Sequence, residues 1–224
     1  GLSNTLVGAL TGDALTDADF NVAIGLGSLG ADTLGSKSVA VGTAALQAQN
    51  FTTATDSHNT AVGHNAGNDV TTGIQNTLLG SLSGDAVTTG SENTALGQAA
   101  LGQDTKGNKT VAVGNGALAT QNFTTSTDSH NTAVGYIAGL SVTTGIQNTL
   151  IGSSAGDALT TGGENVAVGA FALSAEDGHG KNVAVGVQSL LSLDAGADGN
   201  NTAVGYLSGK AVTTGTNNTL IGSL

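Results

Sequence analysis

The chain has 224 residues, a formal net charge of −11, and no proline, cysteine, methionine or tryptophan. The missing cysteines exclude a disulfide framework and cysteine-ligated zinc. The acidity disfavours nucleic acid as a partner, and the absence of a run of about 18 apolar residues excludes insertion of a transmembrane helix in this segment. Charged residues make up 9% and apolar residues 38% of the chain, a balance that favours folding over disorder.

A short segment recurs from one end of the chain to the other, as in Asn59–Gly63 and Asn131–Gly135. Most copies follow one another at a 17-residue spacing, and the exceptions are two 21-residue spacings and one 19-residue spacing. A fixed period of this kind is typical of a solenoid, in which each unit stacks on its neighbours. We predict one continuous β-solenoid of about 13 coils over residues 1–224 and interpret the chain as a fragment of a longer fibrous protein. The glycines that end the copies are Gly8, Gly25, Gly42, Gly63, Gly80, Gly97, Gly114, Gly135, Gly152, Gly169, Gly186, Gly205 and Gly222.

Positions within a coil are counted from this glycine as zero. Position −1 is always Val, Ile or Leu, position −2 is Ala or Leu, position −3 is Thr or Val, and position −4 is mostly Asn. These residues favour a β-strand whose side chains alternate between two faces. Because position −1 is the most apolar, we expect −1 and −3 to point into the coil and −2 and −4 to point outward. We also expect Asn side chains to bond along the stack, and a second extended stretch such as Val70–Gly73 in each coil.

A longer period of four coils, the 72-residue super-repeat, is superimposed on the single coils, and its last copy is a 70-residue one. Leu replaces Ala at position −2 in every fourth coil, and position +4 follows the order Gly, Leu, Leu, Gly. With position −2 outward, these residues would form an apolar stripe that soluble monomers rarely leave bare. We therefore expect another copy of the chain to cover it, although position −2 facing a second apolar layer inside the coil is an alternative. The predicted subunit-interface residues are Leu6, Leu78, Leu150, Leu220, Ala61 and Ala133.

Two of the copies, Ser38–Gly42 and Asn182–Gly186, resemble the head-domain repeat of trimeric autotransporter adhesins. The longer segment from Asn131 to Gly156 is similar to repeats of phage tail fibres that end in a peptidase S74-type chaperone. The resemblance implies a left-handed β-roll, a parallel homotrimer, an extracellular place on a cell surface or virion, and attachment to a host glycan or protein receptor. The coils of this chain are longer than those of the adhesin heads.

The two 21-residue coils carry expansions at 49–58 and 121–130, which we expect to project from the coil. Loops on a rigid scaffold often hold binding groups. The candidate receptor contacts are Phe51, His58, Phe123 and His130. In the alternative interpretation these are solvated loops in which the Phe ring covers the coil below.

No metal or other cofactor is expected, but the acidic residues leave two alternatives. In the first, three chains would bring the expansions together around a metal ion; the candidate ligands are Asp56, His58, Asp128 and His130. In the second, calcium would bind acidic turns through oxygen ligands, although no EF-hand spacing occurs. The candidate calcium ligands are Asp194, Asp198 and Asn200, or Asp17, Asp19 and Asn21.

The sequence favours a structural and adhesive fibre segment and does not favour an enzyme, because no catalytic set of residues repeats or clusters. A self-assembling extracellular filament or sheath protein without a receptor is the second interpretation. An ice-binding solenoid is the third, because Thr recurs at position +8 of many coils, as at Thr71 and Thr143.

Overall fold

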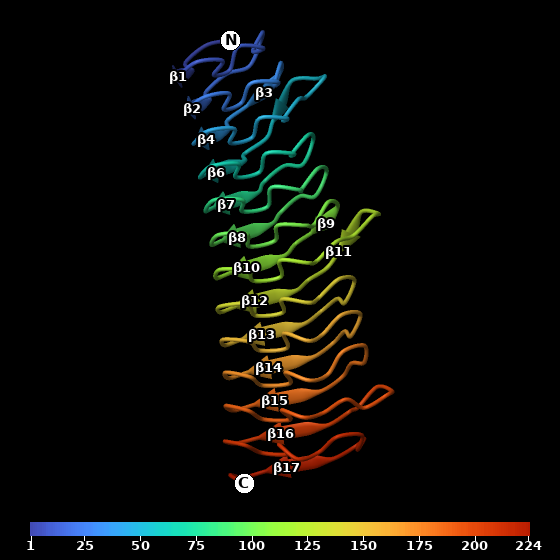
Figure 1. Ribbon diagram of the computed structural model, residues 1–224. Coiled ribbons are helices and arrows are strands. Elements are labelled where there is room, and N and C mark those ends of the chain that lie inside the picture. The colour runs from blue at the N-terminus through green and yellow to red at the C-terminus, as the bar shows by residue number, and fades with distance from the viewer. The chain divides into compact units, whose positions relative to one another are not determined.

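The computed structural model describes residues 1–224 and shows a parallel β-solenoid of about 13 coils with a 17-residue repeat (Figure 1). The chain forms two compact units, the first made of Gly1–Thr110 and Asn122–Thr127 and the second of Val111–Gln121 and Asp128–Leu224. There is no helix that could cross a membrane, because every regular element is a strand. The predicted all-β solenoid and its period are therefore confirmed.

Each coil contributes one three-residue strand, formed by positions −3 to −1. In the first unit these strands are β1 (Thr5–Val7), β2 (Val22–Ile24), β4 (Val39–Val41), β6 (Thr60–Val62), β7 (Thr77–Leu79) and β8 (Thr94–Leu96). In the second unit they are β10 (Val111–Val113), β12 (Thr132–Val134), β13 (Thr149–Ile151), β14 (Val166–Val168), β15 (Val183–Val185), β16 (Thr202–Val204) and β17 (Thr219–Ile221). Four two-residue strands complete the set: β3 (Gly35–Ser36), β5 (Thr55–Asp56), β9 (Gly107–Asn108) and β11 (Thr127–Asp128).

The strands of consecutive coils pair in parallel, position for position. Strand β6 pairs with β4 and β7, so that Ala61 lies between Ala40 and Leu78. In the second unit β13 pairs with β12 and β14 in the same register. The constant register shows that each insertion of extra residues is absorbed outside the strands.

Position −2 points into the coil, so the predicted orientation of the strands is wrong. Ala61 and Leu78 are fully buried, whereas Val62 at position −1 is 38% exposed. The physical reason is packing space: the residue at −2 shares the interior with the residue at +4, and the choice of Ala or Leu at −2 is matched to Leu or Gly there. The alternative that position −2 faces an apolar layer inside the same coil is confirmed.

The predicted subunit interface through position −2 is therefore wrong as well. Its internal members, which lie inside the coil with no exposed surface, are Leu78, Leu150, Ala61 and Ala133. Leu6 and Leu220 hold the same interior position in the first and last coils, where no further coil covers them and Leu6 is 41% exposed. Any association between copies must use a different surface.

A matched choice of Leu and Gly explains the super-repeat. Where position −2 is Leu78, position +4 is Gly in the same coil (Gly84) and in the preceding coil (Gly67). A Cβ atom on either glycine would lie 2.7 Å from a Leu78 methyl group. Where position −2 is Ala, position +4 is a buried Leu, as at Leu101, except in the coil directly before each Leu78-type coil, where it is Gly as at Gly67. Each level of the core thus receives about one large side chain, as close packing requires.

The expected ladder of Asn side chains is present and buried. The Asn76 backbone N–H donates to Asn59 Oδ1 at 2.9 Å, and Asn59 Nδ2 donates to the carbonyl oxygen of Gly73 at 2.8 Å. The same arrangement recurs in the second unit, where Asn148 N donates to Asn131 Oδ1 at 2.9 Å. No buried side-chain nitrogen or oxygen lacks a hydrogen-bond partner. The ladder therefore satisfies the polar groups that the interior encloses.

The glycine at position zero allows the coils to stack closely. Gly63 has φ = +143°, and a Cβ atom there would lie 2.5 Å from the carbonyl oxygen of Gly80 in the next coil. Only glycine fits this combination of left-handed backbone and close approach.

The expected second strand at Val70–Gly73 is not a regular strand but a bend. Its backbone still bonds to the next coil, since Thr71 N donates to the Thr88 carbonyl oxygen at 2.9 Å.

Candidate functional sites

The two expansions bury their aromatic rings. Phe51 and Phe123 are each 5% exposed, and a Cβ atom on Gly35 would lie 2.7 Å from the Phe51 ring. The Phe51 backbone N–H also donates to Asp32 Oδ1 at 3.2 Å. The rings therefore cover the coil, as the solvated-loop interpretation expected, and are not exposed for contact with a receptor.

The charged residues of the expansions lie on the surface. Asp56 Oδ2 pairs with Lys37 Nζ at 2.5 Å, and both side chains are about half exposed. His58 and His130 are exposed and adopt left-handed backbone conformations with φ of 51° and 50°. Every coil has a left-handed residue at this position, directly before position −4, so both histidines occupy a turn that the fold requires. Asp56 thus has a lysine as its partner within the chain.

The two acidic turns considered for calcium do not assemble as expected. Asp198 Oδ2 pairs with Lys181 Nζ at 2.6 Å, and hydrogen bonding to this lysine holds the pKa of Asp198 below its ordinary value. In the other turn, Asn21 is buried and its Oδ1 accepts a hydrogen bond from Ser38 N at 2.8 Å. Asn21 belongs to the interior ladder, so that turn lacks one of its three proposed ligands.

Asp194 instead joins a cluster that the sequence reasoning missed. One ligand-type atom from each of Glu176, Asp177, His179 and Asp194 lies within 4.8 Å of the others. Glu176 is buried, His179 is half-buried and the two aspartates are exposed. Alignment of the three super-repeats would have revealed the cluster, because its residues replace Asp32, Thr33, Gly35 and Asn50 of the first copy.

The outer face of the main strands is uncharged in both units and is aliphatic at position −1 of every coil. It consists of positions −1 and −3, which hold only Val, Ile, Leu and Thr. The exposed fraction of the residue is 37–39% for Ile24, Val62, Leu96, Ile151 and Val204. The sequence prediction places positions −1 and −3 in the interior, and the structure places them on this surface.

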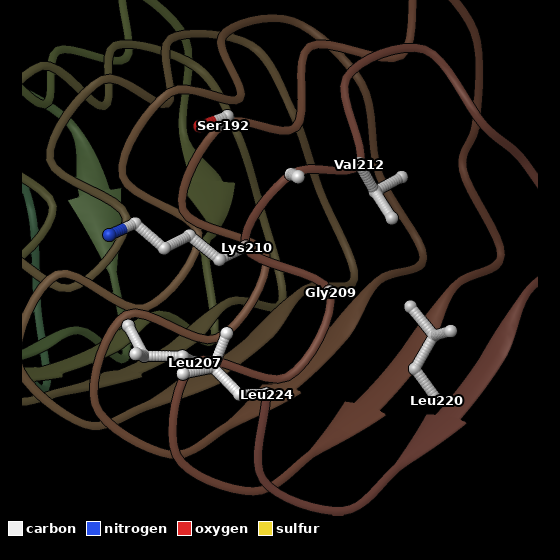
Figure 2. Close-up of a pocket in the computed structure, with 8 residues that line it drawn as sticks. Ser192, Leu207, Gly209, Lys210, Val212, Leu220 and Leu224 are labelled. Carbon is white, nitrogen blue, oxygen red and sulfur yellow. The ribbon is translucent and has the colours of Figure 1, made fainter.

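A cavity of about 560 Å³ lies at the last coils of the second unit (Figure 2). Its walls are largely aliphatic and include Leu207, Val212 and Leu220, which Figure 2 shows as sticks. Val212 and Leu220 hold positions +7 and −2, which Val142 and Leu150 fill as buried residues in an internal coil. The cavity is therefore the solenoid interior opened at its last coil.

Comparisons with family models, with curated proteins and with solved structures found no match. The candidate functions accordingly rest on the chain's own residues and on the arrangement described above.

Proposed function

We propose that the chain is a structural and adhesive fibre segment, extracellular on a virion or cell surface, whose copies associate lengthwise as a parallel homotrimer. In this proposal the coils form a left-handed β-roll. The observation that carries the proposal is the outer face of the main strands, which has no charged residue and leaves an aliphatic side chain partly exposed at position −1 of each coil. An exposed aliphatic row of this kind favours an interaction surface.

The chemistry of the outer face favours a second copy of the chain as the partner. Its side chains recur at the coil spacing, and positions −1 and −3 hold no charged residue in any coil. A partner with the same spacing can place a side chain against every coil, and identical chains meet this condition without further specification. Burial of Val62, Ile151 and their equivalents between copies would remove aliphatic surface from water.

The packing and hydrogen bonding of the interior suit a fibre segment that keeps its length under mechanical load. Three features fix the register of neighbouring coils: the parallel strand pairing in each unit, the packing of a Leu such as Leu78 against a Gly such as Gly67, and the buried Asn ladder. No buried side-chain polar atom lacks a hydrogen-bond partner, so no coil contact is weakened by an unmet buried side-chain hydrogen bond.

The expansions supply the groups for attachment in this proposal. Thr52, Thr53 and His58 are exposed in the first expansion, and Thr124, Thr125 and His130 are exposed at the matching positions of the second. Hydroxyl and imidazole groups are suited to hydrogen bonding with a glycan or a polar protein surface. The receptor is therefore proposed to contact the tips of the 21-residue coils and not their buried phenylalanines.

The test compares the full chain with a variant that lacks residues 52–55 and 124–127. Each deletion removes one insertion and restores the 17-residue length of most other coils. Labelled protein is applied to an array of immobilised glycans and to protein-coated surfaces. We expect the full chain to bind and the shortened chain to lose binding while it still self-associates. Equal binding by both forms, or none by either, would contradict the adhesive role and favour the filament without a receptor.

A further inference from the structure

We propose that Glu176, Asp177, His179 and Asp194 bind one divalent transition-metal ion, with Zn²⁺ as the representative ion. The four side chains offer one imidazole nitrogen and three carboxylate oxygens, all within 4.8 Å of one another. Zinc takes four such ligands at about 2.0–2.2 Å, which places neighbouring ligand atoms roughly 3.3–3.6 Å apart. Small rotations of the exposed aspartates would close the cluster to that size.

The donor set selects the class of ion. Imidazole is a good ligand for zinc and similar transition metals, whereas calcium prefers a shell made of oxygens alone. The His179 ring lies against the buried carboxylate, with Nδ1 3.2 Å from Glu176 Oε1. The imidazole is therefore directed into the cluster, as a ligand of such an ion must be.

An independent observation comes from the matching place in the other two super-repeats. In the first copy, Thr33 Oγ1 donates to Asn50 Oδ1 at 3.0 Å, and in the second Thr105 Oγ1 donates to Asn122 Oδ1 at 3.0 Å. The third copy has Asp177 and Asp194 in place of these neutral, hydrogen-bonded pairs. It also has His179 where the other copies have glycine. The other two copies form the same coils without these three potential ligands, so the coil itself does not require them.

The buried carboxylate has also lost a donor in the third copy. In the first copy, Asp32 Oδ2 accepts a hydrogen bond from the buried Gln49 Nε2 at 2.6 Å. The residue equivalent to Gln49 is Leu193, which is fully buried and offers no donor. Glu176 keeps the backbone N–H groups of His179 and Ala195, at 3.1 and 3.2 Å. A bound cation would interact with this buried carboxylate in place of the side-chain donor that the first copy supplies.

The backbone holds the two aspartates on consecutive coils. The Asp177 carbonyl oxygen accepts from Thr160 Oγ1 at 3.0 Å, and Asp194 N donates to the Thr213 carbonyl oxygen at 2.7 Å. Both occupy position +8, so their like charges are neighbours along the stack and repel. A cation between them converts the repulsion into a link between two coils.

The experiment measures Zn²⁺ binding to the full chain by equilibrium dialysis and, separately, the melting temperature with and without Zn²⁺. We expect one Zn²⁺ per chain, a melting temperature that rises with Zn²⁺, and weaker binding of Ca²⁺. His179→Gly, which restores the residue of the other copies, should weaken binding at least about tenfold by removing one of four ligands. His64→Ala removes an exposed histidine outside the cluster and should leave binding unchanged.

A second variant guards against loss of folding as an explanation. Asp177→Thr together with Asp194→Asn recreates the hydrogen-bonded pair of the first copy, so it should fold at least as well as the parent chain without metal and should not bind Zn²⁺. The proposal is overturned if Zn²⁺ fails to bind at one per chain, if Ca²⁺ binds as tightly, or if either cluster variant retains the parent affinity.

Discussion

The side chain of Leu78 occupies the space that Gly67 leaves open in the preceding coil. A Cβ atom on Gly67 would lie 2.7 Å from Leu78 Cδ1, and the same distance separates a Cβ on Gly84 from Leu78 Cδ2. This relationship recurs one super-repeat later, where Leu150 lies 2.7 Å from the corresponding positions on Gly139 and Gly156. The same packing of one Leu against two Gly residues thus recurs at the spacing of the super-repeat.

The first prediction concerns the leucine of this pair. Leu78→Ala should lower the free energy of unfolding by about 2–5 kcal/mol, because it removes a fully buried side chain and leaves a cavity in the core. Leu79→Ala in the same strand is the matched control, since Leu79 lies on the outer face and is half-buried. Urea unfolding monitored by circular dichroism gives both values. Equal losses would contradict the inward orientation of position −2.

The second prediction concerns the glycine of the pair. Gly67→Ala should destabilise the chain both by strain at φ = +59° and by collision with Leu78. Gly196 has a similar φ of +67° but nothing within 4 Å of its Cβ position, so Gly196→Ala isolates the strain alone, on the order of 1–2 kcal/mol. Differential scanning calorimetry should show a clearly larger loss for Gly67→Ala. A loss no larger than that of the control would mean that Leu78 moves aside freely.

The third prediction tests the buried ladder. Asn59 Nδ2 donates to Gln49 Oε1 and to the Gly73 carbonyl oxygen, each at 2.8 Å. Asn59→Asp removes both donors and places a carboxylate against two acceptors, so it should lower the free energy of unfolding by at least about 2 kcal/mol at neutral pH. Asn65→Asp, at a half-exposed turn position, should have little effect. Chemical denaturation of the two variants at pH 7 makes the comparison, and equal stability would argue against the ladder.

The fourth prediction concerns pH and Asp85. Burial raises the pKa of the Asp85 carboxyl above its ordinary value of 3.8, and the negative charge of Asp69 raises it further. The folded chain therefore holds this proton more tightly than the unfolded chain, so the contribution to stability is complete below pH 3.8 and is lost as pH rises through the raised pKa. Asp85→Asn should raise the melting temperature at pH 7 relative to the parent chain, and the gain should vanish at pH 3.

The control for this prediction is Asp13→Asn, at the same position of the first coil, where the carboxylate is exposed to water. It should give a smaller gain at pH 7. A gain for Asp85→Asn that is the same at pH 3 and pH 7 would show that its effect does not come from the carboxylate.

The period, the number of coils and the Asn ladder were predictable from the sequence, because Gly63 and Asn59 recur at fixed intervals. The orientation of the strand was not, because Ala61 and Val62 are both apolar and a ranking by hydrophobicity favours the larger one as the core residue. Coil width decides the matter, since Ala or Leu at −2 must share the interior with the residue at +4. Width is a property of the closed coil and is not visible in a single strand.

The carboxylate and histidine cluster was hidden for a different reason. Glu176 and Asp194 lie in consecutive coils and look like ordinary polar turn residues within their own coils. Their proximity depends on the stacking of those coils, and their unusual character appears only when Asp177 is compared with Thr33 in the first super-repeat. Asp194 was considered as a ligand, but with Asp198, which pairs with Lys181 instead.

The most direct test of the proposed assembly is the mass of the chain in solution, measured by sedimentation equilibrium over a range of concentrations. We predict a species of three times 21.5 kDa for the parent chain. Ile151→Asp, which places a charge on the outer face where residue 151 is 39% exposed, should give the single-chain mass with its β-sheet circular dichroism retained. A parent chain that sediments at 21.5 kDa at every concentration would contradict association through the outer face.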